Sequence, residues 1–540
     1  MNIPVTSPEA NPLRDQIQRR RTFAIISHPD AGKTTLTEKF LLYAGCIDIA
    51  GAVRGRKTQR AVASDWMELE RERGISITST VLSFPYQGFV INLLDTPGHQ
   101  DFCEDTYRTL AAADSAVMVV DAAKGIEQQT KKLFQVCAAR QIPIMTFINK
   151  MDRHGREPLD LLGEIEQVLG IAAVPLNWPI GLGPEFRGIV DRPSGDCLLF
   201  HPTHRGTLQV PTTVVPLRDV DRFLSTSLAS RCREELELLD GAGEQFDSEQ
   251  FLRGQVTPVF FGSAMTNFGV EPFLHAFVRL APPPGARGSD QGLIPPDHPE
   301  FAGVVFKIQA NLNPKHRDRI AFIRVCRGRF ASDTEPSVAR TGERVRIKGS
   351  HRMFARDRDA IAEAYAGDII GLAIAGGLRL GDTIHEGTPI HYEGLPQFSP
   401  ECFAVARCQD TTRRKQMVEG LNQLADEGAI QLFFDPADSR ELILAAVGEL
   451  QFEVVRFRLE AEYGAKVEIK TLSYRTAAWI DGGHQARAAL QTFRGTRRVL
   501  DHRNREAVLA DDPWHIRYLQ KQNPTLAFRL FSEQFFVPSA

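Results

Sequence analysis

The stretch TFAIISHPDAGKTT, residues 22–35, carries the strongest fold signal in the chain. It begins with an apolar run of strand length and continues into a loop close to the phosphate-binding pattern G-x-x-x-x-G-K-[ST], with Ser27 in place of the first glycine. Gly32 lets the backbone approach phosphates, and Lys33 adds a positive charge at a helix N-terminus. Thr34 supplies a hydroxyl group for Mg²⁺. The stretch therefore predicts a nucleotide-binding loop between a strand and a helix.

Four further apolar runs share this layout, because each is followed at once by polar or glycine-containing residues. FVINLL leads to DTPGH, SAVMVV to DAAKG, PIMTFI to NKMD and TPVFF to GSA. Continuous apolar strands separated by helical segments indicate a mostly parallel sheet covered by helices on both faces. Such sheets bind ligands at the carboxyl ends of their strands, so we expect all five loops to surround one crevice.

Bulk composition restricts the possible partners. The chain has 540 residues, 43% of them hydrophobic, and a formal net charge of -3, which predicts several domains and no general affinity for DNA, RNA or membranes. Eight scattered cysteines without a CxxC pair favour reduced thiols, and no run approaches the roughly 20 apolar residues of a bilayer span. We expect a cytoplasmic protein, a monomer by default. The basic run Arg19 to Arg21 is interpreted as a solvated face.

The motif NKMD, residues 149–152, predicts which base is bound. The Asp152 carboxylate can accept hydrogen bonds from N1–H and the exocyclic amine of guanine, whereas adenine would place an acceptor opposite it. We take Asn149 as a second base-reading residue and expect the Lys150 stem to lie against the base. The backbone around Ser263 and Ala264 would contact guanine O6. Because unpaired buried polar groups are costly, the predicted nucleotide is GTP rather than ATP.

The motif DTPGH, residues 95–99, predicts the hydrolytic machinery. Asp95 stands at a strand end where phosphate-loop enzymes hold the magnesium shell, usually through water. Gly98 can turn its amide toward a terminal phosphate. His99 follows directly, where a side chain can position the attacking water, so we predict that His99 is the catalytic residue.

The charged segment of residues 53–80 lies between these motifs and has little apolar periodicity. It suits a switch that becomes ordered around the γ-phosphate and Mg²⁺. Part of it, ELERER, can equally form a solvated helical face with Glu and Arg pairs.

Taken together, these motifs resemble those of the translational GTPases. Within that superfamily, ISHPDAGKTTLTEK, SDWMELERERGISITS, DFCEDTYRTL and QANLNPKHRDRIAF resemble the bacterial peptide chain release factor 3 family. The similarity covers nearly the whole chain and weakens over the last ~60 residues. The resemblance implies a GTPase that binds the terminating ribosome.

Carried over residue by residue, the resemblance places four segments against GTP or GDP. They are Ser27, His28, Pro29, Asp30, Ala31, Gly32, Lys33, Thr34 and Thr35; Asp95, Thr96, Pro97, Gly98 and His99; Asn149, Lys150, Met151 and Asp152; and Ser263 and Ala264.

The resemblance also suggests three roles around the γ-phosphate. Thr34 and Ser76 would bind Mg²⁺ directly and Asp95 through water, although Thr78 and Thr80 are alternatives to Ser76. Asp30 would help to hold a monovalent cation. Pro29 and Ile75 would form an apolar gate beside His99.

The rest of the chain divides at changes in composition. We predict a GTPase domain over residues 1–282 with an inserted subdomain at about 156–255, a Pro/Gly-rich linker over 283–300, and an antiparallel β-barrel over 301–392. Basic loops such as residues 351–358 could meet RNA phosphates or stay solvated. Residues 393–540 form a third domain, whose element order from residue 401 is the β-α-β-β-α-β order of a ferredoxin-like fold.

The resemblance implies that the chain speeds departure of the codon-reading release factors from the ribosome after peptide release. Two alternatives are a translocase or ribosome-protection factor and a nucleotide-gated ribosomal scaffold with little turnover. Timing of release-factor departure and of GTP consumption separates these functions.

Overall fold

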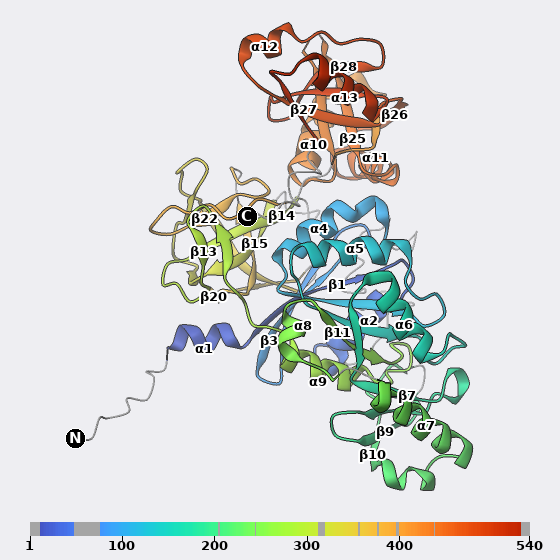
Figure 1. Cartoon of the computed structure of the whole chain (residues 1–540). Coiled ribbons are helices and arrows are strands. Elements are labelled where there is room, and N and C mark those ends of the chain that lie inside the picture. Colours follow the sequence, from blue (N-terminus) through green and yellow to red (C-terminus); the bar gives the residue numbers. More distant parts are fainter. Residues whose placement is uncertain are drawn as a thin grey trace, which may run out of the picture.

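The computed structural model describes residues 11–47, 76–203, 206–242, 245–310, 319–354, 357–374, 377–395, 399–436 and 438–530. A central α/β unit carries a small sheet-containing lobe at one end, and the β-rich second domain and the C-terminal domain lie beyond its other side (Figure 1). The predicted switch segment and Ile75 lie mostly or wholly outside the described residues.

The central unit is built on a mostly parallel sheet, as predicted. Its strand order is β2-β3-β1-β4-β5-β11-β6, and within this run β2 alone pairs in the antiparallel direction, with β3. The five predicted apolar runs become neighbouring parallel strands. The strands of the central sheet are β1 (Arg20–Ser27), β2 (Thr80–Tyr86), β3 (Phe89–Asp95), β4 (Ser115–Asp121), β5 (Ile144–Asn149), β6 (Ala172–Pro175) and β11 (Val256–Phe261).

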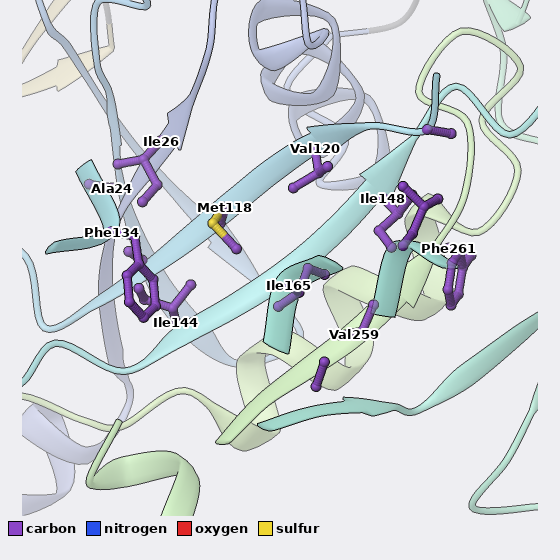
Figure 2. Close-up of a cluster of buried hydrophobic side chains, with 14 of the residues drawn as sticks. Ala24, Ile26, Met118, Val120, Phe134, Ile144, Ile148, Ile165, Val259 and Phe261 are labelled. Carbon is purple, nitrogen blue, oxygen red and sulfur yellow. The ribbon is translucent and has the colours of Figure 1, made fainter. Parts of the chain in front are cut away.

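Helices cover both faces of this sheet, which explains why its strands are continuously apolar. Alternate residues of one strand enter different cores: Ala24 and Ile26 face α4, α5 and α6, whereas Phe23 and Ile25 face α2, α8 and α9. Figure 2 shows the first of these cores. The helices are α2 (Lys33–Tyr43), α4 (Cys103–Ala112), α5 (Gln128–Ala139), α6 (Pro158–Leu169), α8 (Ser248–Leu252) and α9 (Val270–Leu280).

The region expected as an inserted subdomain, about residues 156–255, divides between two places. Helix α6 and strand β6 belong to the central unit, and β6 extends its sheet because it pairs with β11. The separate part is a four-stranded antiparallel sheet of order β10-β9-β8-β7 with helix α7. Its elements are β7 (Asn177–Ile180), β8 (Gly188–Asp191), β9 (Asp196–Phe200), β10 (Thr212–Pro216) and α7 (Thr226–Ala242).

The second domain is antiparallel, as predicted, and follows a short hairpin within the predicted linker. Its strand β18 pairs with β2 at Phe354 and Leu82, so the sheet of the second domain continues into that of the first. The hairpin is β12 (Arg287–Ser289) and β13 (Gly292–Ile294); the domain strands are β14 (Ala302–Ala310), β15 (Arg319–Arg327), β16 (Arg329–Ala331), β17 (Ser337–Val338), β18 (Ile347–Phe354), β19 (Asp357–Ala360), β20 (Glu363–Tyr365), β21 (Ile369–Ile374) and β22 (Thr383–His385).

The C-terminal domain begins with the predicted β-α-β-β-α-β order. Its first four strands pair in the order β26-β23-β25-β24, and β24 continues into β28-β29-β27-β30. The elements are β23 (Cys402–Cys408), α10 (Arg414–Asp426), β24 (Gln431–Asp435), β25 (Asp438–Ala446), α11 (Leu450–Tyr463), β26 (Val467–Leu472), β27 (Thr476–Asp481), α12 (His484–Ala489), β28 (Thr496–Asp501), β29 (Glu506–Ala510), α13 (Pro513–Gln522) and β30 (Ala527–Arg529).

The interpretation of Arg19 to Arg21 as a solvated face is wrong for two of the three residues. After helix α1 (Pro12–Gln18) the chain enters β1, and Arg20 and Arg21 are only 4% and 7% exposed. The Arg20 Nε donates to Asp368 Oδ2 at 2.9 Å, and the Arg21 Nε donates to the Val278 carbonyl at 3.0 Å. A basic run in a sequence does not reveal acceptors that lie hundreds of residues away.

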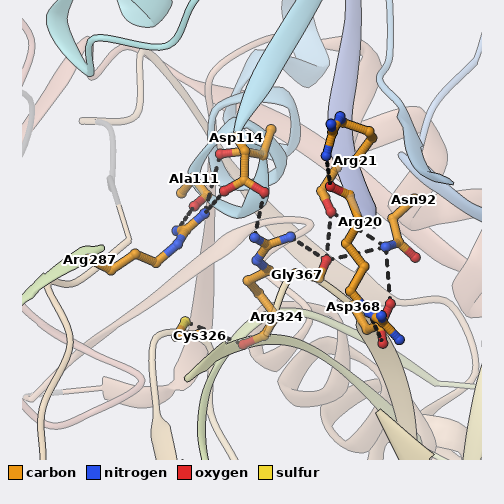
Figure 3. A network of polar contacts seen from close by, with 12 residues as sticks. Arg20, Arg21, Asn92, Ala111, Asp114, Arg287, Arg324, Cys326, Gly367 and Asp368 are labelled. Carbon is orange, nitrogen blue, oxygen red and sulfur yellow. Dashed lines mark hydrogen bonds and ion pairs between the residues drawn. The ribbon is translucent and has the colours of Figure 1, made fainter. Parts of the chain in front are cut away.

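A buried polar network joins the first two domains (Figure 3). The carboxylate of Asp114 accepts from Arg324 Nη2 at 2.5 Å and from Arg287 Nη2 at 3.3 Å. The Arg324 side chain is only 2% exposed, so its charge depends on this partner. Asp114 precedes β4, Arg287 lies in the linker hairpin and Arg324 lies in the second domain. The network therefore fixes the position of one domain on the other.

No helix in the described part of the chain is long and apolar enough to cross a lipid bilayer. The eight cysteines are free thiols, as their spacing predicted.

The substitution Asp114→Ala should destabilise the junction of the first two domains. It leaves the buried Arg324 guanidinium without its carboxylate, which typically costs about 3–5 kcal/mol. We expect a clearly lower midpoint of urea unfolding. Glu249→Ala is the control, because Glu249 and Arg253 form an exposed pair whose side chains are 78% and 67% exposed, and its loss should change stability by less than about 1 kcal/mol. Equal midpoints for the two variants would contradict this account.

Candidate functional site

The carboxyl ends of the parallel strands lie along one edge of the central sheet. Ile25 of β1 is in register with Asp95 of β3, and Asp121 of β4 is in register with Asn149 of β5. The loops that follow these strands carry the motifs singled out in the sequence. The sheet thus brings together residues that are more than a hundred positions apart.

The loop between β1 and α2 has the backbone geometry of an anion-binding nest. Asp30 and Gly32 have left-handed backbones, with φ values of 65° and 96°. Helix α2 begins at Lys33, and the Gly32 position offers its first turn no side-chain cap. The amide groups at this helix N-terminus are thus oriented as phosphate-binding loops require.

Two buried polar side chains open this loop. Ser27, at the position of the missing first glycine, is 1% exposed, and its Oγ has no hydrogen-bond partner among the described residues. The His28 ring is equally buried, and its Nε2 lies 3.7 Å from Glu127 Oε2. Burial holds the pKa of His28 below its ordinary value, and Glu127 opposes this shift. The burial of His28 within the loop could not be inferred from the sequence.

Lys33 and Asp95 form an ion pair between the phosphate loop and the end of β3. Both side chains are buried. Thr96, the residue after Asp95, is fixed to β1 because its hydroxyl donates to the Ile25 carbonyl at 2.6 Å. Thr34, in the first turn of α2, is half-buried next to this pair. A hydroxyl and a carboxylate are oxygen ligands of the kind that Mg²⁺ prefers, so the donor set fits this ion.

The DTPGH loop packs on the phosphate loop. A Cβ atom on Gly98 would lie 3.6 Å from Pro29 Cα, in ordinary contact. His99 follows with 29% of its side chain exposed, and its Nδ1 accepts the Asp101 N–H at 3.2 Å. Gly98, the residue before His99, thus packs on Pro29 of the phosphate loop.

Asn149 ties three of the motifs together. Its Nδ2 donates to the Ala31 carbonyl at 2.7 Å, and its Oδ1 accepts the Ala264 N–H at 2.8 Å. A Cβ atom on Gly32 would overlap the same Nδ2, so glycine is required at that position. Both ends of the Asn149 amide are thus engaged within the protein. Its part in base reading stays a prediction, whereas its part as a strut between loops is evident in the structure.

Lys150 crosses from the NKMD loop to the phosphate loop. Its Nζ donates to the Asp30 carbonyl at 2.6 Å and to Asp121 Oδ2 at 2.7 Å. Burial acts to raise the pKa of Asp121, but the hydrogen bonds from Lys150 and the Ala123 amide outweigh it and hold the pKa below its usual value. No role is predicted for Asp121 from the sequence, although its place directly after an apolar strand is a usable signal.

Asp152 has the property expected of a ligand-binding carboxylate. Its Oδ1 is buried and accepts no hydrogen bond within the described part of the chain. Such an atom is costly to bury unless a ligand donates to it. Met151, which is 1% exposed, holds the loop through its N–H, which donates to the Gly262 carbonyl at 3.1 Å.

The GSA loop uses its amides internally. The Ser263 N–H donates to the Phe268 carbonyl at 2.8 Å, and the Ala264 N–H is taken by Asn149. The contact of this loop with guanine O6 therefore stays a prediction.

The end of the predicted switch segment is tied to its surroundings. The Ser79 N–H donates to Asp105 Oδ2 at 2.6 Å, and Thr80 begins β2 opposite Asp95. Ser76 is half-buried just before this anchored stretch. The choice of Ser76 over Thr78 or Thr80 as a magnesium ligand stays a prediction.

Three family descriptions match successive parts of the chain. "Elongation factor Tu GTP binding domain" matches residues 18–283, "Elongation factor G domain 2" matches residues 300–387, and "Class II release factor RF3, C-terminal domain" matches residues 392–520.

Similar proteins match almost the whole chain. Proteins named "Peptide chain release factor 3" are 52% identical over 517 residues in Rippkaea orientalis, covering 95% of this chain and 96% of the relative, and 51% identical over 526 residues in Trichormus variabilis, covering 97% of each. A crystal structure of a Thermus thermophilus protein has a TM-score of 0.67 at 24% identity and covers 86% of this chain and 71% of its own, which shows a shared fold.

Loss of the Asn149 strut should loosen the candidate site. Asn149→Ala removes both bonds and leaves a buried carbonyl and a buried amide without a partner, each worth about 1–3 kcal/mol. We expect a lower midpoint of thermal unfolding. Asn149→Asp keeps an acceptor for the Ala264 N–H and loses the donor to Ala31, so it should fall between wild type and Asn149→Ala. The same midpoint for Asn149→Ala and wild type would refute the strut.

Proposed function

Because the chain belongs to the peptide chain release factor 3 family and is therefore a translation termination GTPase, we propose that it binds the terminating ribosome and promotes departure of the codon-reading release factors after peptide release. The observation that carries this proposal is the similarity over 95–97% of the chain, including the C-terminal region that matches the release factor description. That region also favours termination over a translocase or ribosome-protection function. The protein acts in the cytoplasm, where ribosomes are found.

The phosphates of GTP or GDP bind the loop from Ser27 to Thr35. The amide groups around Gly32 and the N-terminus of α2 face the α- and β-phosphates, and Lys33 exchanges part of its contact with Asp95 for the outer phosphates. Thr34 and Ser76 would hold Mg²⁺ with their hydroxyl groups, and Asp95 would hold it through water. Bound Mg²⁺ neutralises charge on the β- and γ-phosphates.

Guanine is recognised mainly by Asp152. Its buried Oδ1 accepts from the base, which removes the cost of an unpaired buried acceptor. Adenine has no hydrogen on N1 and would leave this oxygen unpaired, so the same arrangement excludes ATP. The Lys150 Nζ is held by the Asp30 carbonyl and by Asp121, and the aliphatic stem of Lys150 contacts the base.

His99 positions the attacking water. It lies beside the phosphate loop, where Gly98 packs on Pro29, and its ring is partly exposed. The ring must leave the contact with the Asp101 amide or use its other nitrogen, Nε2, to bind water. A monovalent cation near Asp30 would lie close to the Lys150 ammonium group, because that group already contacts the Asp30 carbonyl.

Nucleotide state can act on the ribosome only through different affinities for two ribosomal arrangements. With GTP the protein binds the arrangement from which the codon-reading factor has left, and hydrolysis lowers that affinity and frees the protein. The alternative of a scaffold with little turnover predicts binding without ribosome-stimulated hydrolysis.

Asp152→Asn should exchange the base specificity. The Asn amide places a donor opposite the guanine donors, so GTP affinity should fall by roughly 100-fold or more. Xanthosine triphosphate has a carbonyl at C2, and its affinity should rise. Equilibrium binding of fluorescent GTP and xanthosine triphosphate analogues measures both. If the variant still prefers GTP, Asp152 does not read the base.

His99→Ala should keep nucleotide affinity and lose hydrolysis. We expect ribosome-stimulated GTP hydrolysis to fall by roughly 100-fold or more, because a positioned acid-base or water-orienting group contributes about that factor. His154→Ala is the control, since His154 is exposed in the loop after NKMD.

Wild type and the His154→Ala control test the termination function. Both should accelerate departure of a labelled release factor from post-termination ribosomes over repeated rounds. An unchanged departure rate with wild type would refute the proposed function.

A further inference from the structure

The candidate catalytic histidine is connected to the C-terminal domain through a single carboxylate. Asp101 lies two residues after His99, within the short helix η1 (Gln100–Phe102). Its Oδ1 lies 3.2 Å from His99 Nδ1, and its Oδ2 accepts the N–H of Leu450 at 3.0 Å. Leu450 is the first residue of α11, so Asp101 places a negative charge at the N-terminus of a 14-residue helix of another domain.

Gly448 gives this contact its shape. A Cβ atom at Gly448 would overlap Asp101 Cγ, so the C-terminal domain leaves room for the Asp101 side chain by having no side chain there. The loop around Gly448 is itself fixed, because Gln451 Oε1 accepts the N–H groups of Val447 and Gly448 at 2.8 and 3.1 Å. Asp101, at 12% side-chain exposure, is enclosed between the two domains.

Apolar contacts reinforce the junction. Ile77, near the end of the predicted switch segment, packs with Phe102 of η1 and Val454 of α11 in a buried cluster. Nearby, Arg108 of α4 donates from Nη2 to the Gly428 carbonyl at 3.0 Å. Ile77 and Phe102, from the two segments predicted to approach the γ-phosphate, therefore both contact the C-terminal domain.

We propose that Asp101 is a positioning residue that transmits the placement of the C-terminal domain to His99. This proposal rests on the proposed role of His99 in GTP hydrolysis. While Asp101 caps the N-terminus of α11, helix η1 and His99 are held in the arrangement seen here, with His99 Nδ1 accepting the Asp101 N–H. When the C-terminal domain moves on the ribosome, Asp101 loses the Leu450 N–H and the His99 ring is released to orient water. The contact thus restrains hydrolysis away from the ribosome.

The substitution Gly448→Ala tests the contact from the side remote from the nucleotide. The added methyl group must displace Asp101, and Gly448 does not need a left-handed backbone. We expect ribosome-independent, single-turnover GTP hydrolysis to rise roughly fivefold or more, a factor in the usual range of coupling between sites, with unchanged GTP affinity. The ratio of ribosome-stimulated to basal rate should fall correspondingly.

Gly483→Ala is the matched control, because it makes the same change in the same domain at a position where a Cβ atom meets nothing within 4 Å. Its rates should equal those of wild type. Asp101→Ala removes the group that Gly448→Ala displaces, so the double variant should hydrolyse GTP at the rate of Asp101→Ala alone. Asp101→Asn keeps an oxygen that accepts the Leu450 N–H but removes the negative charge beside His99. This variant therefore separates the effect of the hydrogen bond to α11 from the effect of the charge beside His99.

Three outcomes would overturn the proposal: a Gly448→Ala basal rate equal to that of Gly483→Ala, a basal rate that falls, or additive effects in the double variant. Non-additive effects with a raised basal rate would support it. Wild type and His99→Ala, measured in parallel with ribosomes, distinguish a failure of the proposal from a failure of the proposed function. If wild type shows no ribosome-stimulated hydrolysis that His99→Ala abolishes, the function itself is refuted.

Discussion

Burial of the central sheet on both faces determines where the polar side chains of the site can lie in this protein. Phe23 and Ile25 enter one core while Ala24 and Ile26 enter the other, so β1 has no solvated face on which polar groups could lie. The polar loop motifs therefore follow the strand ends, and in a parallel sheet the carboxyl ends share an edge. Lys33, Asp95, Asn149 and Asp152 come together for this reason.

The site at that edge is held by its own side chains as much as by the sheet. Asn149 joins the phosphate loop to the GSA loop, and Lys150 joins it to Asp121. These bonds fix the loops before a ligand arrives, which reduces the conformational entropy that binding would otherwise cost. The buried oxygen of Asp152, without a donor in the described structure, is the complementary feature, because a site prepared for a ligand keeps an acceptor for it.

Shared carboxylates also govern the domain junctions. Asp114 is shared by Arg287 and Arg324 where the first two domains meet. Where the C-terminal domain meets the first, Asp101 accepts the Leu450 N–H of α11 and lies beside His99. Buried ionic contacts give little net stability, but they favour one arrangement strongly because a displaced charge has no other partner. Such contacts can act as discrete stops for a change of domain arrangement. The apolar cluster of Ile77, Phe102 and Val454 alone would permit sliding.

Features written in local patterns are predictable from the amino-acid order alone. Apolar runs ending in DTPGH and NKMD predict the parallel sheet, its helical layers and the loops at its edge, and the alternation of elements after residue 401 predicts the β-α-β-β-α-β order. Such patterns are readable because each strand or helix carries its own periodicity and its own turn residues.

The polar contacts across domains arise only when the chain is folded. Arg20 binds Asp368, 348 positions away, and Asp101 binds Leu450, 349 positions away, and no local pattern marks either partner. The interpretation of Arg19 to Arg21 as a solvated face fails for that reason. The Asn149 strut cannot be predicted from the sequence for the same reason. Its side-chain amide lies between two loops only because three strands that are distant in the sequence pack side by side.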